Sequence, residues 1–256
     1  MLYTTYQKVH TLSVKEVRRM HALFEAHYAC SPLSTFLDDL ARKEGVFVVR
    51  HKHTHDIVGF STLGVYKFQL GGKVVKGLFS GDTIIERAHW GSRALQTAFA
   101  WKMFTEALKS PFTRQYWLLI SKGYKTYLLL ARNFPEFHPR RERPSPEMSD
   151  LVIDYCEALF PGKLNRQTQL LEFGEDANRL KSDVAAITDA MRADPDIRFF
   201  EQRNPTWEHG TELPCIARAD LPAFARAIVP FLWKVLKQRV SGEAQSSRER
   251  SAARSA

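Results

Sequence analysis

The stretch "IIERAHWGSRALQTAFAWKMF", residues 84–104, joins two kinds of periodicity through a short polar turn. Ile84 and Ile85 form a β-branched pair of the kind that is typical of strands. From residue 92 to about residue 109, apolar side chains recur at helical spacing, which predicts a helix with one face in the core. These apolar residues include Leu95, Ala98, Phe99, Met103, Phe104 and Leu108. The sequence therefore predicts a strand, a turn and a core-facing helix, and the turn is the first place to look for a ligand site.

Upstream of this stretch, the sequence predicts a strand, two helices and an antiparallel meander. Residues 2–11 suit a strand, and Ser13 followed by Glu16 is the pattern of a helical capping box that opens a helix reaching to about residue 28. A second helix follows, starting at Ser31 or Ser34 and ending near residue 43. Residues 45–68 indicate two strands joined by a polar turn, and a glycine pair at 71–72 separates them from a further strand that ends near residue 86.

Downstream, a strand is expected at 114–121 and a helix at 122–133, which ends before Pro135. The basic, proline-rich connector "NFPEFHPRRERPSP" cannot continue that helix. Two more helices are predicted at 147–160 and 175–192, followed by strands in "DIRFFEQR" (196–203) and "TELPCIARAD" (211–220). An apolar helix interrupted by Pro230 closes the folded part, and residues 241–256 form a basic tail with almost nothing to bury, so that we expect disorder there.

Composition narrows the class of protein without naming an activity. The formal net charge of +9 favours anionic partners such as nucleotides, coenzymes, nucleic acid or acidic lipid headgroups. No run reaches the roughly 20 apolar residues of a membrane-spanning helix, and residues 1–12 lack a secretory signal, so we expect a cytoplasmic protein. Cys30, Cys156 and Cys215 lie too far apart for a disulfide framework or a spaced zinc site, and we expect no metal.

Over roughly the first 135 residues, this element order resembles the GCN5-related N-acetyltransferase (GNAT) superfamily. In that superfamily, a turn written Q/R-x-x-G-x-G/A follows the fourth strand and holds the coenzyme A pyrophosphate on backbone amides at a helix N-terminus. The nearest match is "HWGSRA", with His89 at the Gln/Arg position, Ser92 and Ala94 at the two small positions, and Gly91 one residue early. Small residues and a helix dipole suit a phosphate. The alternative is that Ser92 only caps the helix.

The resemblance implies an α+β fold with a mixed, mainly antiparallel central sheet flanked by helices. Residues 1–240 would form one domain, with a helical insertion at 134–192 that builds the acceptor side and an apolar C-terminal helix. The implied activity is transfer of an acyl group from acetyl-CoA or a longer acyl-CoA to an amine, by direct attack in a ternary complex. The residues expected to contact the coenzyme are Ile85, Arg87, His89, Gly91, Ser92, Arg93 and Ala94.

Two carboxylates and one tyrosine are the candidates for proton transfer. In the resembled family, the base is often a carboxylate on or near the fourth strand, which selects Asp82 and Glu86. The alternatives are that Glu86 pairs with a surface cation and that Asp82 stabilises a turn after Gly81. Leu129 occupies the position at which many members place a tyrosine that protonates the thiolate. Tyr124 and Tyr127 lie on the same helix, and Tyr127 is the candidate, with a core role as its alternative.

Three other features leave their roles open. The triplet His51, His53 and His55 lies in a predicted hairpin turn, where a solvated loop is favoured over a metal site. The basic cluster suits the coenzyme 3′-phosphate, an acidic acceptor, a membrane surface or plain solvent. It comprises His138, Arg140, Arg141 and Arg143, with Lys122 and Lys125 near in sequence. The C-terminal helix suits packing on the body, dimerisation, an acyl channel or peripheral membrane contact.

Two other classes of function compete with acyl transfer. The first is a noncatalytic binding module of the same fold for a nucleotide, coenzyme A or a protein partner, which the missing tyrosine and the degenerate turn would permit. The second is nucleic-acid binding through the basic surface, which ranks last because no helix-turn-helix, zinc-finger or aromatic RNA-binding pattern is present. The acyl chain length, the acceptor and the oligomeric state do not follow from the sequence.

Overall fold

A seven-stranded sheet forms the centre of the computed structural model, which describes residues 1–29, 32–70, 72–174, 179–180 and 187–226. The strand order is β1-β3-β4-β5-β6-β11-β7, and every neighbouring pair is antiparallel except β5 and β6, which run parallel. The strands are β1 (Leu2–Lys8), β3 (Gly45–His51), β4 (Ile57–Leu70), β5 (Lys73–Ile85), β6 (Gln115–Ser121), β7 (Phe137–His138) and β11 (Leu213–Arg218).

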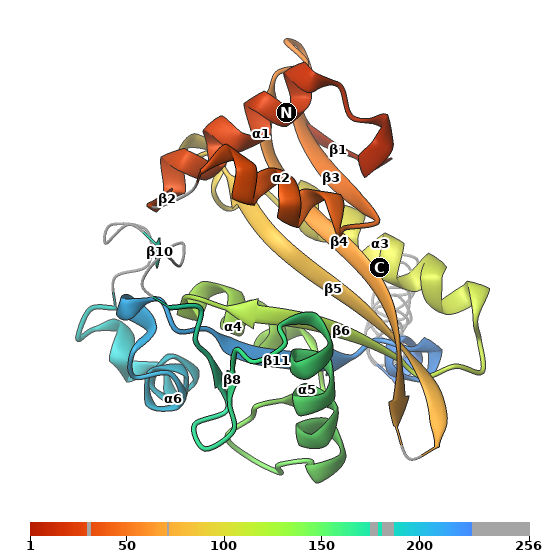
Figure 1. The fold of residues 1–256 in the computed structure, drawn as a ribbon, viewed down its shortest axis with the longest axis vertical. Helices are drawn as coiled ribbons and strands as arrows, with labels where there is room; N and C mark the ends of the chain where they lie inside the picture. The colour runs from red at the N-terminus through yellow and green to blue at the C-terminus, as the bar shows by residue number, and fades with distance from the viewer. Residues whose placement is uncertain (30–31, 71, 175–178, 181–186, 227–256) are drawn as a thin grey trace, which may run out of the picture.

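Helices cover both faces of this sheet (Figure 1). One face packs against α1 and α2 at the β1–β5 end and against α5 over β6 and β11, while α3, α4 and α6 pack on the other face. Alternation explains the division, because Val46 and Val48 of β3 face α1 and α2 whereas Phe47 and Val49 face α3. The helices are α1 (Val14–His27), α2 (Leu33–Ala41), α3 (Ala94–Lys109), α4 (Tyr124–Asn133), α5 (Pro146–Leu159) and α6 (Pro195–Arg203).

Short elements complete the described chain. β2 (Tyr28–Ala29) pairs with β10 (Arg179–Leu180), and β8 (Leu164–Asn165) pairs with β9 (Leu170–Leu171). Single turns of 3-10 helix lie at Val9–Thr11, Arg87–His89, Met191–Ala193 and Trp207–His209. Among the described residues, no helix has the length and apolar character needed to cross a bilayer.

The structure confirms the predicted α+β class, with a mixed, mainly antiparallel central sheet flanked by helices. The capping box is present, since Ser13 Oγ accepts from the Glu16 amide at 3.3 Å and Glu16 Oε2 accepts from the Ser13 amide at 2.7 Å. Within the connection at 134–192, the described chain holds α5 and the short strands β7 to β10, and β7 joins the central sheet. Residues 221–226 are helical, and the remainder of the predicted C-terminal helix and tail lies outside the described residues.

Two predicted elements are wrong. "DIRFFEQR" is not a strand but most of α6, because Asp194 caps that helix by accepting from the amides of Asp196 and Ile197, and Pro195 occupies its first position. Ile197 and Phe200, three residues apart, then point into the core together. The helix expected at 175–192 is also absent where that segment is described, since strand β10 and a 3-10 turn occupy those residues.

A bulge interrupts β5 near its carboxyl end. β4 and β5 pair Ser61 with Thr83 and then Leu63 with Ser80, so that two residues of β5, Gly81 and Asp82, lie opposite the single residue Thr62. The parallel ladder between β5 and β6 ends at Ser80 and Leu119. Beyond that point β5 continues to Ile85 without pairing to β6. The bulge therefore lies where the two strands part.

Tyr155 offers a test of how α5 is attached to the sheet. Its side chain is fully buried, and its hydroxyl donates to the carbonyls of Leu119 at 3.0 Å and Cys215 at 3.2 Å. Tyr155→Phe should lower the free energy of unfolding by about 1–3 kcal/mol, because two buried acceptors lose their donor. Urea unfolding would measure this, with Tyr3→Phe, whose hydroxyl lies in an exposed contact with His55, as the control. Equal stability of the two variants would contradict the assigned role.

Candidate active site

Asp82 is the predicted catalytic residue with the most distinctive surroundings. It is partly buried at the β5 bulge, and titratable groups from four other parts of the chain face it. Asp39 belongs to α2, and Lys43 follows that helix; Lys122 follows β6, Glu212 precedes β11, and Tyr28 belongs to β2. These segments are far apart in the sequence, so that only the tertiary fold brings them to one carboxylate.

The surrounding charges are already paired with one another. Lys43 Nζ donates to Asp39 Oδ1 at 2.7 Å, and Lys122 Nζ lies 3.2 Å from Glu212 Oε1, whose side chain is almost fully buried. Among the described residues, no hydrogen bond or ion pair reaches the Asp82 carboxylate. Asp82 is therefore an unpaired carboxylate between two ion pairs.

This environment changes the acidity of Asp82. Burial raises its pKa to about 6, and the neighbouring carboxylate of Asp39 acts in the same direction, while Lys122 and Lys43 oppose the shift. Burial likewise raises the pKa of Glu212, against the effect of Lys122. A carboxylate whose pKa lies near neutrality is suited to accept a proton and release it again at physiological pH.

Glu86, the second predicted carboxylate, is committed to other partners. It follows the last residue of β5 and forms an ion pair with Arg19 of α1, and His89 Nε2 lies 4.0 Å from its other oxygen. Both Glu86 and His89 line a cavity of about 460 Å³ that also involves Arg19, His51, Thr54, Asp56 and Val58. The structure thus gives Glu86 the pairing with a surface cation that the sequence left open, with Arg19 as the cation.

The turn after β5 has the backbone of a ligand-binding loop. Gly91 has a φ of +88°, which favours glycine, and no atom lies within 4 Å of the position that its Cβ would take. Arg93, and not Ser92 as in the alternative reading of the turn, is the N-cap of α3, and its side chain makes no capping hydrogen bond. Ser92 Oγ accepts only a long contact, 3.4 Å, from the Ala94 amide. Amides in the first turn of α3 have no acceptor within the helix.

Cationic and aromatic side chains surround this loop. Trp90 donates its indole N–H to the carbonyl of Ile85 at 2.8 Å, and its ring is about half exposed. Lys125 Nζ lies 4.4 Å from the centre of that ring, and the Arg87 guanidinium lies 5.8 Å from it. Burial lowers the pKa of Lys125, and Arg87 adds to the effect. The loop therefore combines helix-terminal amides with cations from two elements, an arrangement that suits an anion.

Tyr127 lies in the core. Its side chain is fully buried among Phe137, Phe199 and Phe200, and its hydroxyl donates to the Pro139 carbonyl at 3.1 Å. Burial raises the pKa of this phenol further above its usual range. Its placement matches the core role that the sequence left open. Leu129, at the family's tyrosine position, is partly buried against the same core.

Apart from Lys122, the remaining sequence candidates lie away from Asp82. His51 ends β3, and His53 and His55 lie in the β3–β4 turn; the described residues contain no group of side chains arranged to hold a metal. The basic cluster borders β7, which β6 and β11 separate from β5. Within it, burial lowers the pKa of His138 to about 4, so that this imidazole is neutral at pH 7. Cys156 and Cys215 are buried free thiols.

The residues that the sequence did not select are those brought in by tertiary structure. Lys43, Glu212 and Tyr28 carried no signal, and Lys122 and Lys125 appeared only as part of a basic cluster. The register of β6 against β11, which pairs Ser121 with Leu213, is what brings Lys122 next to Glu212. No motif spacing could have indicated that contact.

No family model and no curated protein matches this sequence. Several solved structures are similar to it at low identity. An acetyltransferase of Trypanosoma brucei is 18% identical, with a TM-score of 0.37, over 57% of this chain and 99% of its own. A GNAT family N-acetyltransferase of Escherichia coli in complex with CoA is 9% identical, with a TM-score of 0.36, over 53% and 69%.

A probable N-acyltransferase of Enterococcus faecalis is 9% identical to the chain, with a TM-score of 0.40, over 52% of this chain and 32% of its own. The similarity therefore spans about a third of the Enterococcus protein. At TM-scores below 0.5, these likenesses do not identify the chain.

The raised pKa of Asp82 predicts a pH-dependent cost to folding. A carboxyl whose pKa rises from 3.8 to about 6 on folding binds more protons in the native state, so that stability falls as the pH rises through this window. Asp82→Asn removes this cost and should be more stable than the wild type by on the order of 1–3 kcal/mol above pH 7, with the difference disappearing as the pH falls below 3.8. Urea unfolding at several pH values would measure the gap.

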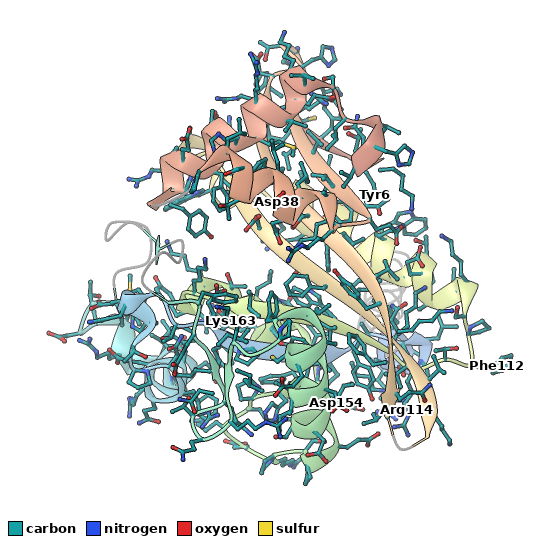
Figure 2. All side chains as sticks on the ribbon, viewed as in Figure 1. Tyr6, Asp38, Phe112, Arg114, Asp154 and Lys163 are labelled. Carbon is teal, nitrogen blue, oxygen red and sulfur yellow. The ribbon has the colours of Figure 1, made fainter. Side chains whose placement is uncertain are left out.

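Asp38→Asn is the matched control, because Asp38 is exposed on the same helix as Asp39 (Figure 2). This variant should follow the wild type at every pH. A gap between Asp82→Asn and the wild type that stays constant from pH 4 to pH 8 would contradict the linkage argument.

Proposed function

We propose that this chain is a divergent member of the GNAT superfamily that transfers an acyl group from a coenzyme A thioester to an amine. The observation that carries the proposal is the unpaired carboxylate of Asp82, whose pKa is raised to about 6, at the point where β5 parts from β6. The same strand leads directly into the cationic loop at the N-terminus of α3. A base and an anion site thus lie at one end of one strand.

The coenzyme would bind with its pyrophosphate at the loop. Backbone amides around Gly91 and Ser92 and at the start of α3 would donate to the phosphate oxygens, and Arg87 and Lys125 would supply positive charge. His89 and Arg93 flank this position, and Ile85 joins the loop to the core. The thioester would then extend towards Asp82 along the part of β5 after Ser80, which does not pair with β6.

Asp82 would act as the general base. Its carboxylate takes a proton from the acceptor ammonium, directly or through water, and the free amine attacks the thioester carbonyl carbon. Collapse of the tetrahedral intermediate breaks the carbon–sulfur bond and releases the coenzyme as a thiolate, and the second amine proton passes to solvent. With Leu129 at the family's tyrosine position, the thiolate takes its proton from solvent or from protonated Asp82.

Ligand-induced stabilisation tests the coenzyme site. Coenzyme A, acetyl-CoA and medium- and long-chain acyl-CoA should raise the melting temperature by several degrees, since a ligand at about 100 times its Kd adds roughly 2.7 kcal/mol. ATP serves as the anionic control. A larger shift for one chain length would identify the acyl donor, whereas equal shifts for ATP and every thioester would indicate a general polyanion site.

Ser92→Glu should abolish this shift, because it places bulk and negative charge at the pyrophosphate position. The matched control is Ser34→Glu, which introduces the same residue into the exposed first turn of α2. A preserved shift in Ser92→Glu would exclude the loop as the coenzyme site.

Turnover separates the two carboxylates. With an amine acceptor in hand, Asp82→Asn should lower kcat by about 10²–10⁴-fold while leaving the Kd for acyl-CoA within a few-fold of the wild type. Glu86→Gln should retain most of the activity, because Glu86 is paired with Arg19. The reverse ranking would make Glu86 the base. Binding of acyl-CoA without turnover by the wild type, across a panel of amines, would favour the noncatalytic module.

A further inference from the structure

The side chain of Lys43 lies across the bulge in β5. Lys43 follows α2 and lies with its side chain only 5% exposed, and its ammonium stands 5.3 Å from the ring centre of Phe79, two residues before Gly81. A Cβ on Gly81 would lie 3.1 Å from Lys43 Cε and 2.3 Å from Thr62 Oγ1. The absence of a side chain at Gly81 is therefore what lets Lys43 cross the bulge beside Asp82.

Among the described residues, the groups that face Asp82 are Asp39 and Lys43 from the α2 side, Lys122 after β6, Glu212 before β11 and Tyr28 of β2. Lys122 is held by the buried carboxylate of Glu212. Lys43 is held by Asp39, whose side chain is 41% exposed and therefore well solvated. Of the two lysines near Asp82, Lys43 is therefore the one whose carboxylate partner is more solvated and less firmly held.

We propose that Lys43 is a positioning residue for Asp82. The Lys43 side chain lies across Gly81, and its ammonium keeps the Asp82 carboxylate ionised at neutral pH. The inference rests on the proposed role of Asp82 as the base. Without Lys43, the Asp39 carboxylate would lose its partner and would face Asp82 uncompensated. A larger fraction of Asp82 would then be protonated at neutral pH, and that fraction could not accept a proton from the amine.

Opposite substitutions in the Asp39–Lys43 pair give a signed test. Lys43→Met should raise the titration midpoint of Asp82 by about one pH unit, a tenfold change in the ratio of protonated to ionised carboxyl at a fixed pH. Asp39→Asn should lower the midpoint, because it removes a like charge and releases Lys43 towards Asp82. The double variant should return close to the wild type, and Lys43→Arg should restore the wild-type midpoint in part.

The midpoint is measured on the full chain by NMR of ¹³C-labelled aspartate carboxyls, with the Asp82 signal assigned from its loss in Asp82→Asn. This readout needs neither coenzyme nor turnover. Lys67→Met is the control, since it removes one exposed lysine from the neighbouring strand β4. Where turnover is found, the acid limb of the kcat profile should move with the NMR midpoint in each variant.

An Asp82 midpoint in Lys43→Met equal to that of Lys67→Met would overturn the proposal. If Lys43→Met does not fold, the decision passes to Asp39→Asn and Lys43→Arg: a midpoint unmoved in Asp39→Asn would overturn the proposal equally. Shifted midpoints together with no acyl transfer to any amine would uphold Lys43 as the group that sets the charge of Asp82 and would remove the acyltransferase assignment. Acyl transfer together with unmoved midpoints would uphold the acyltransferase assignment and overturn the role of Lys43.

Discussion

The parallel pairing of β5 with β6 is the constraint on which the rest of the structure depends. Parallel neighbours cannot be joined by a tight turn, so that the chain must cross over one face of the sheet between them, and α3 makes that crossing. The carboxyl ends of both strands consequently lie at the same edge, next to the N-terminus of the crossover helix. β5 and β6 are the one parallel pair of the described sheet. They are therefore the pair whose carboxyl ends lie beside the N-terminal amides of α3.

The bulge in β5 lies at the point where this parallel pairing ends. One extra residue at Gly81 and Asp82 interrupts the β4–β5 ladder where β5 leaves β6, and it places a carboxylate in a region that already holds two ion pairs. Each lysine is neutralised by its own acid, so that neither pairs fully with Asp82. Burial, which the two lysines offset only in part, raises the pKa of Asp82 to about 6, and the native state is less stable above pH 6 because of it.

The sequence predicted those parts of the fold that depend on local chemistry. Patterns of residues close in sequence predicted the capping box at Ser13 and Glu16, the three-strand meander and the core face of α3. The structure has each of them. The α6 error has a local cause as well, since the Asp194–Pro195 pair is a helix start that the apolar run after it obscured. The surroundings of Asp82 were beyond local reasoning, because Lys43, Lys122 and Glu212 meet it only through the packing of α2 and the register of β11 against β6.

The position of β11 between β6 and β7 has a consequence for synthesis on the ribosome. The strands from β1 to β6 are complete once residue 121 has emerged, but β6 keeps an unpaired edge until residues 213–218 follow. Such an edge is open to pairing with other chains. Glu212 arrives with β11, so that its contact with Lys122 forms only at that stage. The nascent chain therefore acquires its carboxylate-bearing strand early and the charge environment of that strand last.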